Sequence, residues 1–190
     1  MKKLVLLVFV ILTFQSFSQE KTQQKEWYAT AGVNFINSLG SRNPLKNPGD
    51  WAFSNPFAVS VEYRGSENFA IEQTFSINKF KKGESIDSTI LNKDYNYFAA
   101  DTSLKYYVGH LLFNFLSRSD MYVNLGGTYF SVSEANVAGH LGIGYMYWLN
   151  KDRTFALRTQ VLGKVALNNS SSGLTTNHYQ YFLQVLYRFK

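Results

Sequence analysis

The feature that most constrains this chain is a two-residue period of hydrophobicity that recurs along most of its length. From Trp27 onward, eight segments alternate apolar and polar side chains, a pattern typical of β-strands whose two faces meet different surroundings. Phe and Tyr, with 16 and 13 residues, are abundant, as strands favour. The predicted strands cover residues 27–35, 57–64, 69–78, 106–115, 121–129, 140–149, 155–167 and 179–189. The period therefore predicts an all-β fold of eight strands.

Charged residues occupy only one face of these predicted strands. The apolar face carries no Asp, Glu, Lys or Arg, whereas the other face combines charges with Gly, Ser, Thr and Asn. A soluble barrel needs charges outside, but a Lys or Arg that faces lipid at the bilayer midplane costs about 2–4 kcal/mol. Aromatic side chains stand at the margins of the apolar face, as in the interfacial girdles of membrane barrels: Trp27, Tyr63, Tyr107, Tyr129, Tyr147, Tyr179 and Tyr187. We therefore predict that the apolar face contacts lipid.

The predicted connections differ in length on the two sides of the sheet. Short links follow the second, fourth and sixth strands, whereas the other side has two long connections, one intermediate connection and a short one at Ser133. The short links lie near 65–66, 117–119 and 150–152, and the longer ones cover about 38–56, 80–102 and 168–177. Outer-membrane barrels have short periplasmic turns and longer extracellular loops. The prediction is an eight-stranded antiparallel up-and-down transmembrane β-barrel whose N- and C-termini are periplasmic.

The N-terminus predicts secretion. Two lysines precede an apolar run from Leu4 to Phe14, and small residues lead to a cleavage site after Ser18, which is the layout of a signal peptide. The run is shorter than the roughly 18 apolar residues that a membrane-spanning helix requires. We expect a signal peptide over 1–18, a short periplasmic segment over 19–26 and the barrel over 27–190.

The last segment, YQYFLQVLYRFK, is similar to the C-terminal assembly signal of outer-membrane barrels, with Tyr187 and Phe189 as its final aromatic residues. Together with the strand number, it makes the chain resemble small single-domain outer-membrane barrels of the OmpA/OmpX type. The resemblance implies the outer membrane of a Gram-negative bacterium, insertion by the barrel-insertion machinery, and contact with outer-membrane lipids and lipopolysaccharide. We expect no peptidoglycan-binding domain, and therefore no wall-anchoring function.

Several charged residues fall on the predicted inward face. They are Glu62, Arg64, Glu72, Arg158, Lys164 and Arg188. In a ring of eight, the third and seventh strands face each other, so we expect Glu72 and Arg158 to meet across the lumen. Side chains fill the interior of such a barrel, and buried charges persist when they are paired. We predict a polar network that plugs the lumen, with a gate for small ions as the alternative and a solute-sized pore excluded by the barrel width.

No motif for chemistry stands out. His110 and His140 lie on the predicted inward face and His178 at the outer start of the last strand, without a spacing that brings two together, so no metal site is predicted. The chain has no Cys, no Gly-x-Ser-x-Gly elbow and no His-x-Ser-Asn run as in barrel deacylases. We therefore predict no catalytic residues, no cofactor and no enzymatic activity. A lipid A-modifying barrel enzyme is the alternative.

The outer loops carry the candidate contacts with partners. The cluster formed by Lys79, Lys81 and Lys82 is either a solvated loop base or, more specifically, a contact with lipopolysaccharide phosphates, which basic clusters favour. Loop aromatics either anchor a partner or pack onto the rim: Trp51, Phe53, Tyr95, Tyr97 and Phe98. Two lysines of the expected signal peptide contribute to the net charge of +6, so we predict no nucleic-acid partner.

We accordingly predict a non-enzymatic outer-membrane protein with a structural or surface-interaction role through its long loops and an unidentified extracellular partner. A secreted ligand carrier of the lipocalin kind is a further alternative. It would require a Gly-x-Trp motif near the first strand, which the residues around Trp27 do not supply.

Overall fold

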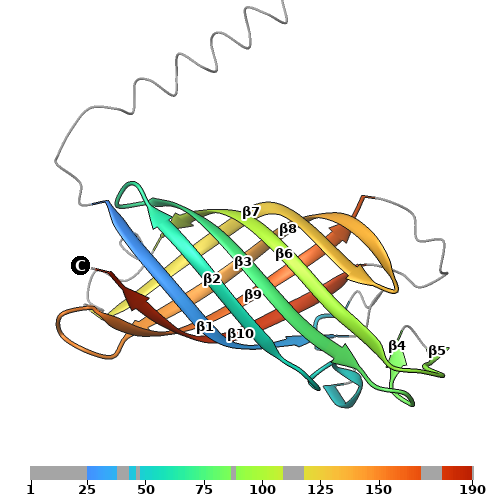
Figure 1. Ribbon diagram of the computed structural model, residues 1–190. Helices are drawn as coiled ribbons and strands as arrows, with labels where there is room; N and C mark the ends of the chain where they lie inside the picture. Colours follow the sequence, from blue (N-terminus) through green and yellow to red (C-terminus); the bar gives the residue numbers. More distant parts are fainter. Residues whose placement is uncertain are drawn as a thin grey trace, which may run out of the picture.

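The computed structural model describes residues 25–37, 43–45, 48–86, 89–108, 118–167 and 177–189, so the expected signal peptide lies outside the described residues. Eight antiparallel strands close into a barrel in which β1 pairs with β10 (Figure 1). They are β1 (Glu26–Ile36), β2 (Phe57–Arg64), β3 (Phe69–Phe80), β6 (Tyr95–Tyr107), β7 (Ser119–Val132), β8 (Glu134–Trp148), β9 (Phe155–Ala166) and β10 (His178–Arg188). The predicted all-β, eight-stranded, antiparallel up-and-down barrel is confirmed.

Two small elements lie in the loops. A short 3₁₀ helix, η1 (Pro48–Asp50), precedes β2, and the hairpin of β4 (Ser85–Ile86) and β5 (Thr89–Ile90) lies between β3 and β6. Within the described residues, no helix has the length and hydrophobicity required to cross a bilayer.

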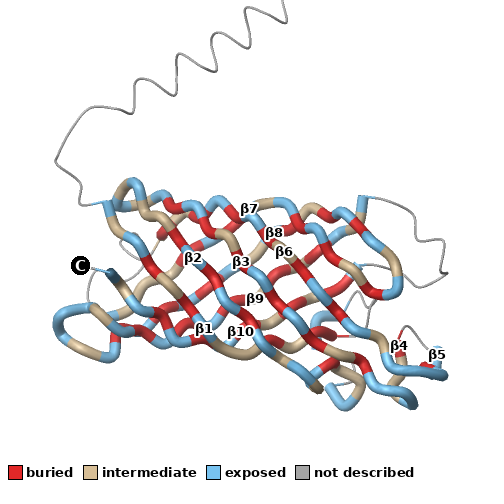
Figure 2. Tube along the Cα trace, viewed as in Figure 1, coloured by how far each residue is buried: buried red, intermediate tan, exposed pale blue. Residues whose placement is uncertain are grey.

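Buried and exposed residues alternate along the barrel strands (Figure 2). The outward positions carry large apolar side chains, such as Leu125, which is 62% exposed, and Leu141, which is 66% exposed. Among the described strand residues, Lys79 at the loop end of β3 is the one Lys, Arg, Asp or Glu at an outward position. The wall is thus apolar outside, and the ionised side chains point into the lumen.

The predicted fourth strand is wrong. We placed it at residues 106–115, but the barrel strand in this position is β6, and residues 109–117 lie outside the described part of the chain. Tyr107, which we assigned to the lipid-facing girdle, is instead buried inside the barrel. The residues after Tyr107 are more hydrophobic than the outward face of β6, which includes Ala100 and Thr102. Hydrophobicity therefore favoured the wrong segment.

This shift changes two connections. The second outer connection covers only 81–94, and Tyr95, Tyr97 and Phe98 belong to β6 and not to a loop. On the side of the termini, residues 108–118 join β6 to β7, so the short turn predicted at 117–119 is not the whole link. The second outer connection is therefore shorter than predicted.

Aromatic residues of the first loop pack against the outside of the barrel. Trp51 stacks on Tyr181 with ring centroids 4.8 Å apart, and Phe53 stacks on Phe35 at 4.4 Å. Both partners are outward residues near the loop end of their strands. For these two aromatics, the structure shows packing onto the rim.

Apolar side chains close both ends of the interior. At the loop end, one buried cluster includes Ile36, Phe80, Ile86, Leu91 and Phe130. At the end that holds the termini, a second cluster includes Tyr28, Tyr107, Tyr122, Met146 and Trp148. The polar interior therefore lies between two apolar layers.

Candidate functional site

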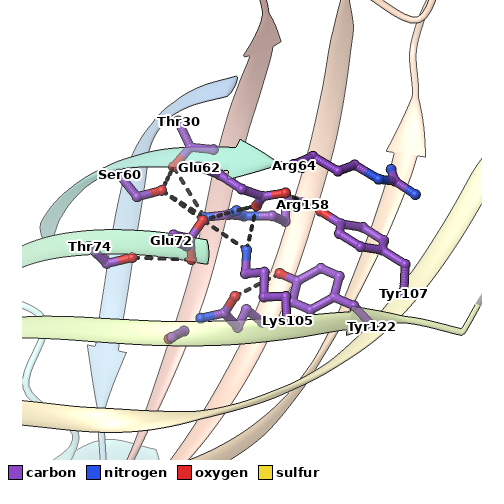
Figure 3. A network of polar contacts seen from close by, with 12 residues as sticks. Thr30, Ser60, Glu62, Arg64, Glu72, Thr74, Lys105, Tyr107, Tyr122 and Arg158 are labelled. Carbon is purple, nitrogen blue, oxygen red and sulfur yellow. Dashed lines mark hydrogen bonds and ion pairs between the residues drawn. The ribbon is translucent and has the colours of Figure 1, made fainter. Parts of the chain in front are cut away.

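The centre of the polar interior is a layer of four buried charges (Figure 3). Glu62 on β2 and Glu72 on β3 stand opposite each other in the strand register. Lys105 of β6 places its Nζ 2.8 Å from a carboxylate oxygen of each. Arg158, from β9, pairs with Glu72 and lies 3.4 Å from Glu62. Each of the four side chains is at most 1% exposed, so two acids and two bases balance one another in the buried interior.

The remaining Arg158 donors are also used. Nη2 donates to Oε1 of Gln184 at 2.7 Å and to the hydroxyl of Ser60 at 3.0 Å, while Nε donates to the same Gln184 oxygen at 3.1 Å. Tyr107 donates its hydroxyl hydrogen to Glu62. A planar guanidinium suits such a fork of acceptors. This layer, defined by Glu62, Glu72, Lys105 and Arg158, is here called the four-charge layer.

A second polar layer lies nearer the loop end. Lys164 of β9 contacts the Asp101 carboxylate at 2.6 Å and donates to Gln180 at 2.6 Å. Thr128 of β7 donates to the same Asp101 oxygen at 2.7 Å. All four residues are at most 2% exposed. The barrel thus contains two neutral charge groups, because the second layer holds one acid and one base.

His140 joins this second layer to Ser103. Since the Thr128 hydrogen goes to Asp101, the Thr128 oxygen accepts from Nδ1–H of His140 at 2.8 Å. Nε2 then accepts from the Ser103 hydroxyl at 2.9 Å. The order Ser–His–Thr–Asp resembles the relay of a hydrolase, but Ser103 is only 1% exposed, and Gly126 lies so close to the ring that a Cβ there would be 2.7 Å from Nε2. No room is left for a substrate at this hydroxyl.

The structure separates the predicted network residues into three places. It brings Glu62, Glu72 and Arg158 together and puts Lys164 in the second layer. Arg64 and Arg188 lie at the rim near the termini, where Arg64 is 3.6 Å from Asp120 and Arg188 is 3.2 Å from Glu26. His140 faces inward as expected, whereas His110 lies outside the described residues.

Lys105 and Asp101 were missed by the sequence reasoning, because both belong to the strand that was misplaced. A signal was present: Asp101, Ser103 and Lys105 recur at every second position, and Phe98, Leu104 and Tyr106 occupy positions of the other parity. The network predicted from the sequence lacked Lys105, so Arg158 was the one base available to Glu62 and Glu72 at the centre of the lumen.

The other predicted contact residues lie away from the lumen. Lys79 pairs with Asp94 at 2.7 Å, and the backbone N–H of Lys82 donates to the same carboxylate at 2.9 Å. These two hydrogen bonds lower the pKa of Asp94 from its usual 3.8. Lys81 and Lys82 are exposed.

The predicted assembly-signal residues stand at the terminus end, where Tyr187 contacts both Phe155 and Phe189 with ring centroids 5.1 Å apart. In the described part of the chain, no three His, Asp or Glu side chains are grouped to hold a metal ion.

Neither a protein-family model nor a curated protein sequence matches this chain. Solved structures do. The outer membrane protein OprG of Pseudomonas aeruginosa is similar over 88% of this chain and 97% of its own, with a TM-score of 0.59 and 13% identity. Neisserial surface protein A is similar over 90% of this chain and 99% of its own (TM-score 0.55, 13% identity).

A third similar structure is Ail, the attachment invasion locus protein of Yersinia pestis, solved in complex with the heparin analogue sucrose octasulfate. It matches over 88% of this chain and 100% of its own, with a TM-score of 0.51 and 14% identity. At these identities the likeness is one of fold, and that fold is the eight-stranded barrel of outer-membrane proteins.

Proposed function

We propose that this chain is an integral outer-membrane protein of a Gram-negative bacterium with a non-enzymatic structural or surface-interaction role. The observation that carries the proposal is the distribution of charge. Outward strand positions are mostly apolar and carry one charge, Lys79 at an end, whereas the ionised side chains within the wall are buried in the lumen. Water outside would make this arrangement unfavourable, and hydrocarbon makes it favourable.

The interior supports a plug and not a pore. In the four-charge layer each carboxylate contacts both bases, and apolar side chains cover the layers at both ends. Removing one member would leave the buried layer with one uncompensated charge, which is strongly unfavourable. We infer that this network holds the barrel in one closed arrangement, in preference to gating small ions.

The orientation follows from the termini and loops. Secretion followed by insertion leaves both termini in the periplasm, with Tyr187 and Phe189 near that end available to the insertion machinery. The first loop and the β4–β5 hairpin then lie on the extracellular side. Lys81 and Lys82 on this side are exposed, and we propose that they and Lys79 contact lipopolysaccharide phosphates, because basic clusters favour anionic headgroups.

Membrane insertion is tested by cell fractionation combined with gel migration before and after boiling. We expect the protein in the outer-membrane fraction and a faster band without boiling, since a closed barrel resists detergent. Recovery in the aqueous fraction without detergent would overturn the proposal.

The lipid contact is tested with the triple variant Lys79→Gln, Lys81→Gln and Lys82→Gln. Lipopolysaccharide that copurifies with the barrel should fall. The control is Lys151→Gln with Arg153→Gln, because these two residues lie in the turn at the opposite end. Equal retention by both variants would contradict the contact.

The absence of catalysis is tested by lipid A mass profiles of cells with and without the protein. We expect identical profiles. A change in acyl-chain number would favour the lipid A-modifying alternative.

A further inference from the structure

The outer wall of the barrel has a groove near its loop end. It occupies about 850 Å³ over β8, β9 and β10, and Pro44 and Leu45 of the first loop form part of its lining. Most of the wall side chains that line it point outward, toward the surroundings of the barrel and not into the lumen: Leu141, Ile143, Val161, Val165, Tyr179 and Tyr181.

Gly163 creates the depth of this groove. In the strand register it lies between Leu141 of β8 and Tyr179 of β10, and Val161 and Val165 are the next outward residues along β9. Large side chains thus surround a position that has none. A Cβ at Gly163 would lie 3.2 Å from Cε1 of Tyr179, so the side chain of Tyr179 leans toward the vacant position. The groove is a gap in an otherwise continuous apolar surface.

The first loop covers part of this gap. The Tyr181 hydroxyl donates to the backbone carbonyl of Pro44, and Trp51 stacks flat on the Tyr181 ring. Leu45, next to Pro44, is 69% exposed. These contacts hold the loop against the outside of the wall. They leave the apolar side chain of Leu45 exposed beside the groove, and such exposure is unfavourable in water.

We propose that this groove binds one acyl chain of an outer-leaflet membrane lipid. The inference rests on the proposed membrane location, because the groove is continuous with the apolar belt and lies at the end assigned to the outer leaflet. A cavity of about 150 Å³ holds the six carbons of benzene, so the volume of the groove is ample for a flexible chain. The lining is apolar enough to hold methylene groups, and the loop would slow exchange with bulk lipid.

Trp51 provides a reporter, since it contacts a lining residue. The full mature chain would carry Trp27→Phe, which removes the tryptophan on the outer wall at the opposite end. Trp148 remains, but it is 4% exposed inside the barrel and contributes a constant background. The protein is folded in detergent micelles, and phosphatidylcholine with dibrominated acyl chains is titrated in while Trp51 fluorescence is followed. We expect saturable quenching at a low mole fraction of lipid, because a specific site competes with detergent.

Gly163→Leu occupies the vacant position in the groove and should raise the half-quenching fraction about fivefold, the order expected for losing contact with one or two methylene groups. The matched control is Gly127→Leu, another outward glycine, where a Cβ would meet nothing within 4 Å. It should leave the titration unchanged. Leu45→Ser is a second variant, and because Leu45 is largely exposed it tests the loop contact without disturbing the barrel wall.

Three outcomes would overturn the inference. The first is the same titration curve for the folded Gly163→Leu and Gly127→Leu proteins. The second is wild-type quenching that rises linearly with the amount of bulk lipid. The third is quenching by brominated free fatty acid at a lower mole fraction than by the phospholipid. A protein that shows no heat-modifiable band in any detergent would instead contradict the proposed membrane function, so the two failures are distinguishable.

Discussion

The interior and the outer wall of this barrel differ in how they hold the same strands. Inside, the charged side chains have defined partners: each carboxylate in the four-charge layer contacts two bases, and aromatic residues lie at both ends. Outside, the side chains are large, apolar and exposed, and their contribution depends on their hydrophobicity more than on a defined partner. The comparison teaches that specificity lies in the lumen, whereas the wall presents the apolar surface on which the proposed membrane location rests. Substitutions on the two faces should therefore fail for different reasons.

The largest effect is expected inside, for Arg158→Met. The change leaves Glu62 and Glu72 with Lys105 as their one cationic contact. The buried layer then carries one uncompensated negative charge, and breaking a buried ion pair in this way costs about 3–5 kcal/mol. The free energy of unfolding, measured by urea titration in lipid vesicles, should fall by that amount.

The control for this prediction is Arg188→Met. Its side chain lies at the rim and is 23% exposed, so the loss should be about 1 kcal/mol or less. Similar losses for Arg158→Met and Arg188→Met would mean that the four-charge layer does not specify the fold.

The next effect is expected on the outer wall. Leu125→Lys places a cation at the middle of β7 on the outward face, which should lower the free energy of unfolding by about 2–4 kcal/mol. Ser131→Lys puts the same charge on the same face near the end of the strand, where the cost should be about 0–1 kcal/mol. A barrel that tolerates both changes equally would not have hydrocarbon around its middle.

Two adjacent glycines, Gly126 and Gly127, allow the two faces of the wall to be compared at neighbouring positions. Gly126 faces the lumen, where a Cβ would lie 2.0 Å from the Thr102 carbonyl oxygen, whereas a Cβ at Gly127 would meet nothing within 4 Å. Gly126→Ala should therefore lower the free energy of unfolding by about 1–3 kcal/mol through overpacking. Gly127→Ala should change it little. Equal effects would show that the lumen is less tightly filled than the contacts indicate.

The smallest effect is expected at the base of the second loop, where it concerns the pKa of Asp94. Hydrogen bonds from Lys79 and from the backbone of Lys82 lower the pKa of Asp94. A lowered pKa means that the contact is favoured when the carboxyl is ionised and is lost as the pH falls through that pKa.

In Lys79→Gln, a carboxyl NMR titration between about pH 2 and 5 should show the pKa of Asp94 closer to its ordinary value. Lys151→Gln, at the opposite end of the barrel, should leave it in place. An unchanged pKa in Lys79→Gln would show that this ion pair is absent in solution.

Seven of the eight strands could be predicted from the sequence because their two faces differ strongly in polarity. The strand that failed, β6, has Ala100 and Thr102 among its outward residues, and a more apolar stretch follows it. The error also moved Tyr107 to the wrong face and concealed Asp101 and Lys105. Local hydrophobicity alone was a weaker guide here than the alternation of Asp101, Ser103 and Lys105.

By itself, the sequence determined which side chains face outward and which face the lumen, because a strand has a period of two and the charges keep to one of its faces. It also indicated that Glu72 and Arg158 could meet. Only the tertiary structure decided which charges share a layer: closure of the barrel and the stagger of its strands bring Lys105 to Glu62 and Glu72, while Lys164 reaches Asp101. The fold also decided that Trp51 and Phe53 pack outside the rim. Contacts between residues distant in sequence depend on that closed geometry, which no local pattern contains.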